Sequence, residues 1–316
     1  MATPAESFRR FTPFTVTLTA LTFALIVVGA TTRAVGAGLS CPDWPLCNGK
    51  LIPTFEGGVF FEWFHRLIAG SVSMLFMGLV VWALVDRNLR ARLWGVMTFA
   101  VGMLIVQIVL GGLTVLDLLK PYIVTLHLST GSLLFGAFNL VMWRTLAVSR
   151  SLSPAESQPR GLKPLGAFAL GLTYLQIVLG GLVASNYAAW ACPDWPKCHG
   201  MWLPPMVGLV GIHMTHRFIA YLVLIVVTAL AIVARKSPDL RIRVGAGIAG
   251  VLVWLQVALG VLNVLNGIPV PLTAAHNGCG EALFATLIAV TFALFAGVPA
   301  GDGPDSLPTL REAVAR

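Results

Sequence analysis

The chain has 316 residues, of which 57% are hydrophobic and only 11% are charged, and its formal net charge is +8. A soluble domain carries about a quarter charged residues, so this composition excludes a soluble protein. The basic balance does not indicate a nucleic-acid partner. Most of the 21 lysines and arginines lie beside apolar runs, where they are typical of a membrane topology.

Eight apolar runs are long enough to cross a bilayer, which needs about 20 residues each. Most basic residues precede the first run, follow an even-numbered run or end the chain, so the positive-inside rule predicts that both termini are cytoplasmic. The run from Phe14 to Thr32 is long enough to span, which indicates an uncleaved first helix rather than a signal peptide. The predicted spans are 14–32, 62–85, 94–116, 122–143, 165–186, 210–234, 244–266 and 272–298.

An internal repeat divides the chain into two copies of a four-helix unit. The segment Cys41-Pro-Asp-Trp-Pro-Leu-Cys47 recurs 151 residues later as Cys192-Pro-Asp-Trp-Pro-Lys-Cys198. Three further markers recur in the same order and at nearly the same offset. They are His65-Arg66 with His216-Arg217, Gln107 with Gln256, and His127 with His276. Gln107-Ile-Val-Leu-Gly-Gly-Leu also matches a segment beginning at Gln176, although that match lies outside the repeat register.

The repeat predicts an all-α polytopic membrane protein with eight transmembrane helices in two pseudo-symmetric four-helix bundles. Both units enter the membrane in the same direction, so an axis along the membrane normal should relate them. We expect the first unit at 1–146, a cytoplasmic linker at 147–163, the second unit at 164–300 and a cytoplasmic tail at 301–316.

Four histidines begin the even-numbered spans near their outer ends. Ionisable residues inside a membrane are costly and are usually functional. Two imidazoles at one depth in a helix bundle can bind a heme iron from opposite axial sides. A metal ion held by protein alone is the nearest rival, but no carboxylate or thiolate cluster accompanies either pair. The four histidines are His65, His127, His216 and His276.

One position distinguishes the two predicted pockets. Glu62 lies one turn before His65, whereas the equivalent residue in the second unit is His213. Residues three apart share a helix face, so we predict a carboxylate in the first pocket and none at the equivalent place in the second. An acid in the first turn also complements the helix dipole, but that does not explain why the repeat changes chemistry here.

Arg66 and Arg217 directly follow a predicted ligand in each unit. They could pair with heme propionates, which are anionic and prefer the membrane edge. They could equally extend to the interface for their own hydration.

The two cysteine segments lie in outer loops, where an oxidising compartment favours disulfides Cys41–Cys47 and Cys192–Cys198. Their stiff, amphipathic interiors suit a cap over a pocket at the membrane surface. Zinc is disfavoured because the pairs belong to different bundles, and a redox-active dithiol in the first unit stays an alternative. Cys279 is expected to be an inert core residue.

In combination, the Glu-x-x-His-Arg element at Glu62–Arg66, the duplicated units, the four histidines and the cysteine loops resemble bacterial heme A synthases. The resemblance covers essentially the whole chain except the tails. It implies an oxidoreductase of the bacterial cell membrane that oxidises the C8 methyl of heme O to a formyl group by two hydroxylations. The product, heme A, serves terminal oxidases. Many family members have a cysteine pair only in the first outer loop, or none, so the second pair here favours a structural role.

The same resemblance implies that Glu62 is catalytic and that His65 and His127 bind the iron of heme O in the first unit. It implies a heme B in the second unit, bound by His216 and His276. Expected partners are heme O, membrane lipid, an electron acceptor and the farnesyltransferase that makes heme O, with a homo-oligomer left open.

Two imidazoles on one iron leave no position for oxygen. We therefore predict stepwise electron removal from the bound heme, capture of water at the oxidised methyl and proton acceptance by Glu62. A bis-His diheme electron carrier is the main alternative, and it predicts hemes on opposite sides of the bilayer. A heme transporter would not need Glu62, and a thiol oxidoreductase would make the histidines incidental.

Overall fold

The computed structural model describes residues 3–152 and 157–295. They form eight long helices, each apolar and long enough to cross a membrane, which confirms the predicted all-α polytopic membrane fold. The predicted tail at 301–316 and the end of the eighth predicted span lie outside the described residues. The helices are α1 (Pro4–Ala34), α2 (Val59–Val85), α3 (Arg87–Leu116), α4 (Pro121–Ser149), α5 (Leu162–Ser185), α6 (Gly208–Ala234), α7 (Leu240–Leu265) and α8 (Val270–Phe295), with a short 3-10 helix η1 (Ala188–Ala191) before α6.

Several helices begin earlier than their apolar runs. α1 begins at Pro4, well before Phe14, because the Thr3 side chain accepts the N–H of Glu6 at 3.3 Å and proline suits the first turn. α3 begins at Arg87 because the Asp86 carboxylate accepts the N–H of Asn88 at 2.8 Å. Hydropathy marks the membrane-buried part of a helix, whereas a capping side chain marks its end.

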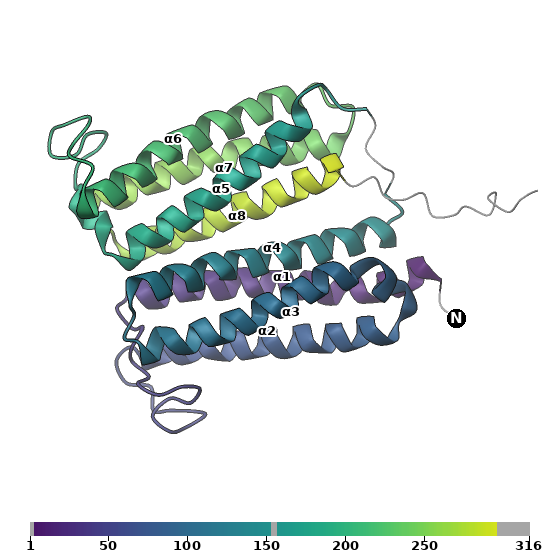
Figure 1. Ribbon diagram of the computed structural model, residues 1–316, viewed down its shortest axis with the longest axis horizontal. Coiled ribbons are helices and arrows are strands. Elements are labelled where there is room, and N and C mark those ends of the chain that lie inside the picture. Colours follow the sequence, from purple (N-terminus) through teal and green to yellow (C-terminus); the bar gives the residue numbers. More distant parts are fainter. Residues whose placement is uncertain (1–2, 153–156, 296–316) are drawn as a thin grey trace, which may run out of the picture.

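The helices form two groups of four (Figure 1). In the first group α1 contacts α2, α2 contacts α3, α3 contacts α4, and α4 returns to α1; α5–α8 repeat this ring. Each ring has its own apolar core, with Phe76 and Phe138 in the first and Leu172 and Leu287 in the second. The groups meet where α1 and α4 pack against α5 and α8. The same ring order in both groups agrees with a duplication, and the axis relating them stays a prediction.

The contact between the groups holds a buried acid that the sequence analysis missed. Glu281 on α8 is 1% exposed, and the Ser132 hydroxyl on α4 donates to its Oε1 at 2.6 Å. Its other oxygen has no hydrogen-bond partner, and Phe135 and Phe284 belong to the apolar cluster between the groups. Ser132 and Glu281 are 149 residues apart, which makes them repeat equivalents. A lone acid inside an apolar run is the signal that could have revealed the site.

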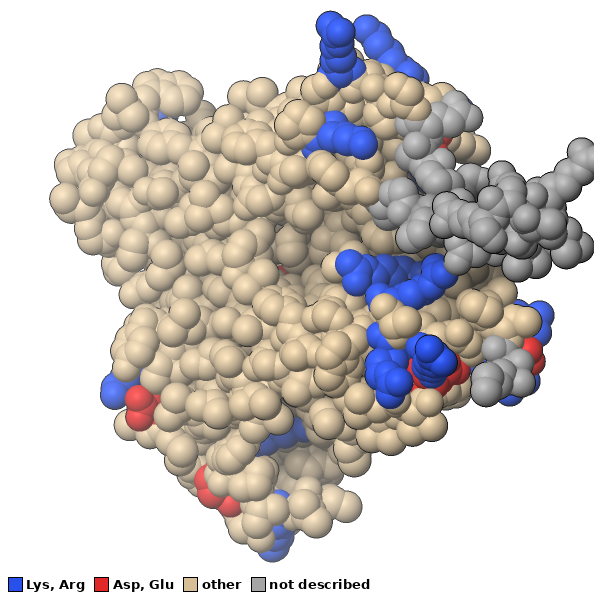
Figure 2. All heavy atoms as spheres, turned by 45° about the vertical axis from the view of Figure 1, so that its right-hand side comes forward, with Lys and Arg blue, Asp and Glu red and all other residues tan. Residues whose placement is uncertain are grey.

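The two ends of the molecule differ in charge. Both cysteine loops lie at one end in Figure 1, whereas the N-terminus and the end of α8 lie at the other. Figure 2 shows lysines and arginines gathered towards the end that carries the termini. The predicted membrane orientation, with both termini in the cytoplasm, depends on this distribution of lysines and arginines.

Replacing Glu281 by alanine should lower the free energy of unfolding by about 2–4 kcal/mol, because it leaves a cavity and removes the acceptor of Ser132. Glutamine keeps both the volume and an acceptor oxygen, so it should stay within about 1 kcal/mol of wild type. The midpoint of thermal unfolding in detergent measures both variants. An unchanged midpoint for the alanine variant would show that the contact does not stabilise the packing of the two groups.

Candidate functional site

The four histidines form two pairs, one inside each ring of helices. His127 of α4 lies near enough to His65 of α2 for an electrostatic interaction, and so does His216 of α6 to His276 of α8. Within each ring the two helices concerned are not neighbours but face each other. Each histidine follows the start of its helix by about two turns, so the two members of a pair share one depth.

A glycine of the preceding helix packs against every one of these imidazoles. The pairs are Gly29–His65, Gly111–His127, Gly180–His216 and Gly260–His276. A Cβ added to the glycine would lie 2.8–3.3 Å from Cε1 of the ring, which is closer than ordinary contact. Cε1 is the nearest ring atom in all four cases, so the four rings present the same edge to the glycine. The small residue is required because the ring occupies the space of a side chain.

The chemistry of these residues fits axial ligands for a heme iron. Nδ1 of His65, His127 and His276 is buried without a hydrogen-bond partner, and such atoms need an explanation. Within the described ranges no group of three or more His, Cys, Asp or Glu could hold a metal ion by itself. Two imidazoles per ring are too few for a structural zinc but are a complete axial set for heme.

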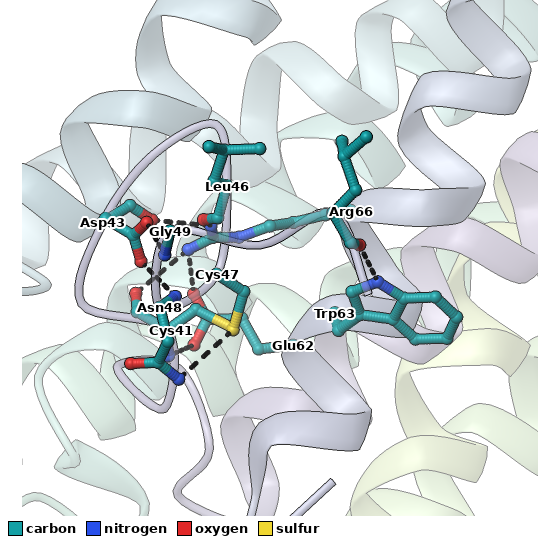
Figure 3. Close-up of a disulfide and its surroundings, with 10 residues drawn as sticks. Cys41, Asp43, Leu46, Cys47, Asn48, Gly49, Glu62, Trp63 and Arg66 are labelled. Carbon is teal, nitrogen blue, oxygen red and sulfur yellow. Dashed lines mark hydrogen bonds and ion pairs between the residues drawn. A yellow bond between two sulfur atoms is a disulfide. The ribbon is translucent and has the colours of Figure 1, made fainter. Parts of the chain in front are cut away.

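Both predicted disulfides are present, and Cys279 is a buried free cysteine as expected. The first loop is closed a second time by Asp43, whose carboxylate accepts the N–H of Asn48 at 2.6 Å and of Gly49 at 2.8 Å (Figure 3). Gly49 has a φ of 70°, a conformation that glycine adopts without strain. Asp194 closes the second loop in the same way.

An arginine attaches each loop to the helix that follows it. Arg66 of α2 donates to the carbonyl oxygens of Asp43 at 2.7 Å, of Cys41 at 3.1 Å and of Leu46 (Figure 3). Arg217 of α6 donates to the three equivalent carbonyls at 2.7–3.0 Å. Both arginines therefore anchor the loops, a role that the sequence analysis did not consider. Their pairing with heme propionates stays a prediction.

Glu62 is part of the same anchor. The residue is 5% exposed, its Oε1 accepts from Arg66 at 2.5 Å, and its Oε2 accepts the N–H of Cys41 at 2.8 Å (Figure 3). In the second unit Nε of Arg217 donates to Nε2 of His213 at 3.2 Å. Glu62 is thus bonded to the disulfide loop, one helical turn from His65.

The tryptophans of the two loops differ in their contacts. Trp44 lies against Gly112 of α3, where an added Cβ would be 3.3 Å from the indole ring. The first loop therefore contacts α3 next to Gly111, the glycine that packs against His127. A loop that capped the first pocket would make such a contact. In the second loop Trp195 instead donates to the hydroxyl of Tyr221 on α6 at 3.1 Å.

The backbone N–H groups of Gly49 and Gly200 hold the pKa of Asp43 and of Asp194 below the usual value of 3.8. A lowered pKa stabilises the closed loop above the ordinary pKa, and this contribution is lost as the pH falls through the lowered value. The rate at which a water-soluble phosphine reduces the disulfides should be constant relative to a model disulfide above about pH 5 and should rise below about pH 4.

Asp43→Asn serves as the control for the first loop, since it removes the titrating group. In this variant the relative reduction rate of Cys41–Cys47 should not change across this pH range, whereas that of Cys192–Cys198 should still rise in acid. A wild-type protein without any acid-dependent rise would contradict a role for these carboxylates in closing the loops.

Comparison with known proteins agrees with this geometry. A family model described as cytochrome oxidase assembly protein matches residues 12–57 and 53–288, which include both cysteine loops and all four histidines. A heme A synthase of Shewanella oneidensis is 30% identical over 315 residues, covering 87% of this chain and 93% of that protein. Heme A synthases of Symbiobacterium thermophilum and Halalkalibacterium halodurans are each 29% identical, covering 82% and 88% of this chain and 87% and 95% of their own lengths. The chain therefore belongs to the heme A synthase family of cytochrome oxidase assembly proteins.

Proposed function

We propose that this multi-pass membrane protein is a heme A synthase that oxidises the C8 methyl of heme O to a formyl group. The observation that carries the proposal is the pair of histidine sites in one chain, alike in their glycines but different at Glu62 and His213. Relatives named heme A synthase align with this chain over nearly their whole length.

The first ring is the proposed substrate site, with His65 and His127 as ligands of the heme O iron. The second ring would hold a heme B through His216 and His276, which supplies a route for electrons. Conversion of a methyl to a formyl group with water as the oxygen source releases protons as well as electrons. Glu62 is the proposed proton acceptor, because it is the carboxylate one turn from His65. Its bonds to Cys41 and Arg66 attach the Glu62 carboxylate to the disulfide loop.

The proposed location is the bacterial inner membrane, with both termini in the cytoplasm and the cysteine loops outside. Two disulfides at one end of the molecule favour an oxidising compartment there, and the basic residues gather towards the other end. The expected partners are an electron acceptor and the farnesyltransferase that supplies heme O. A homo-oligomer is compatible with this arrangement.

A diheme electron carrier also accounts for two histidine pairs. It would place the hemes on opposite sides of the bilayer, whereas all four histidines lie near the helix ends that carry the cysteine loops. This observation favours the synthase.

Pigment analysis tests the proposed activity. Heme extracted from protein expressed with a source of heme O should contain heme A or its hydroxylated precursor for wild type, and only heme O and heme B for Glu62→Ala. His213→Ala is the matched control in the second ring, and it should still yield product. Recovery of heme B alone from every preparation would favour the electron carrier.

The oxygen source is a separate prediction. While both imidazoles are bound, the iron offers no position for oxygen, so the formyl oxygen should come from water. Product made under isotopically labelled oxygen gas, in conditions where the formyl oxygen does not exchange, should be unlabelled by mass spectrometry. A labelled formyl group would exclude water as the source.

The glycines provide a structural test of the ligand assignment. Gly29→Ala places a Cβ 2.8 Å from Cε1 of His65 and should lower heme O content about tenfold, because the ring must move. Gly260→Ala should lower the heme B content by a similar factor, because the imidazole of His276 must move. Gly78→Ala on α2 meets no atom within 4 Å and should leave both contents unchanged. Full heme content in both of the first two variants would contradict the assignment.

A further inference from the structure

On each odd-numbered helix, two residues that lie one helical turn apart face the histidine of the following helix. The second position is always the glycine that packs against the ring. The first position is glutamine in three of the four helices. The pairs are Gln107–Gly111 on α3, Gln176–Gly180 on α5, Gln256–Gly260 on α7 and Leu25–Gly29 on α1. This recurrence explains why the segments at Gln107 and Gln176 match although they are out of register with the repeat.

In the second ring the glutamines reach both imidazoles. Nε2 of Gln176 lies 3.0 Å from Nδ1 and 3.3 Å from Nε2 of His216, and it donates to the backbone carbonyl of His216 at 3.0 Å. Nε2 of Gln256 lies 3.3 Å from Nε2 of His276. An amide can turn either its nitrogen or its oxygen towards a ring, so it can accept from an imidazole N–H as well as donate to it.

In the first ring the glutamine contacts are different. Gln107 donates to the backbone carbonyl of His127 at 2.9 Å and to the hydroxyl of Thr130, but not to the ring. At the fourth position the side chain of Leu25 packs against the apolar core and has no amide, and His65 interacts with the backbone of Leu25 instead. In the described part of the chain, no glutamine side chain bonds to either imidazole of the first ring.

We infer that these glutamines determine how firmly each ring of helices holds its heme, and that Leu25 makes the first ring the exchangeable one. A partner that bonds to a ligating histidine fixes the orientation of the imidazole and raises its affinity for the metal. An imidazole that no side-chain amide holds loses more rotational freedom on binding and leaves the iron more readily. Exchange suits a pocket whose heme enters as substrate and leaves as product, whereas retention suits a prosthetic group. The inference rests on the proposed ligand roles of the four histidines.

The rate of heme loss from the purified, heme-loaded full-length protein tests the inference. Excess apomyoglobin in the detergent solution would collect released heme, and mass analysis of the heme left on the protein would distinguish heme O from heme B. Wild type should lose heme O faster than heme B. Leu25→Gln should slow the loss of heme O about tenfold, and Gln176→Leu should accelerate the loss of heme B about tenfold.

Leu25→Met is the matched control, because it has a similar volume and no amide, and it should behave as wild type. Equal rates in all variants, or a slowing by Leu25→Met as large as that by Leu25→Gln, would overturn the inference and leave the proposed activity intact. Protein that binds no heme in any preparation would instead overturn the proposed function, and the inference with it.

Discussion

The contact between an imidazole and the glycine of the preceding helix occurs four times, and the rest of the site depends on it. Inside a membrane a polar ring cannot rely on water, so its place between helices must be set by packing and by a small number of polar neighbours. Glycine lets the backbones approach until the ring fills the space of the absent side chain. Because the same ring edge faces the glycine each time, the two histidines of a pair are fixed at one depth on facing helices. That geometry is the one in which two imidazoles can share an iron.

The outer loops are joined to these sites through neighbouring residues of the chain. Arg66 and Arg217 each follow a proposed ligand directly, and each bonds to three carbonyls of a loop that a disulfide and an aspartate also close. A movement of the loop therefore acts on the helical turn that bears the histidine. In the first unit Glu62 belongs to the same network, so the position of the loop and the surroundings of the proposed proton acceptor are coupled. In the second unit His213 occupies that place and accepts a hydrogen bond from the arginine.

The internal repeat of the sequence agrees with the same order of helix contacts in both rings, and a small number of residues distinguish the two rings. Where the first unit has Glu62, the second unit has His213, and this difference changes the chemistry beside the arginine anchor. Where the first unit has Leu25, the second unit has Gln176, and this difference changes the contacts of the imidazole. Ser132 and Glu281 are also repeat equivalents, and they bond to each other across the contact between the groups. A contact between equivalent residues is what the predicted axis between the copies would produce. The duplication thus explains both the shared scaffold and the positions at which the two pockets could diverge.

The sequence by itself determined the eight spans, the duplicated unit, the histidine pairs, both disulfides and the difference at Glu62, because hydropathy, spacing and repeat offsets are properties of the chain read in order. It did not determine where α1 and α3 begin, since capping side chains such as Thr3 and Asp86 extend helices beyond their apolar runs. Only the tertiary structure assigned Arg66 and Arg217 to the loops and matched each glycine to its imidazole. It also showed which glutamines bond to an imidazole and revealed the contact of Ser132 with Glu281. These are contacts between helices, and the partner of a polar atom in a membrane is decided by which helices pack together, a relation that no local pattern of the sequence contains.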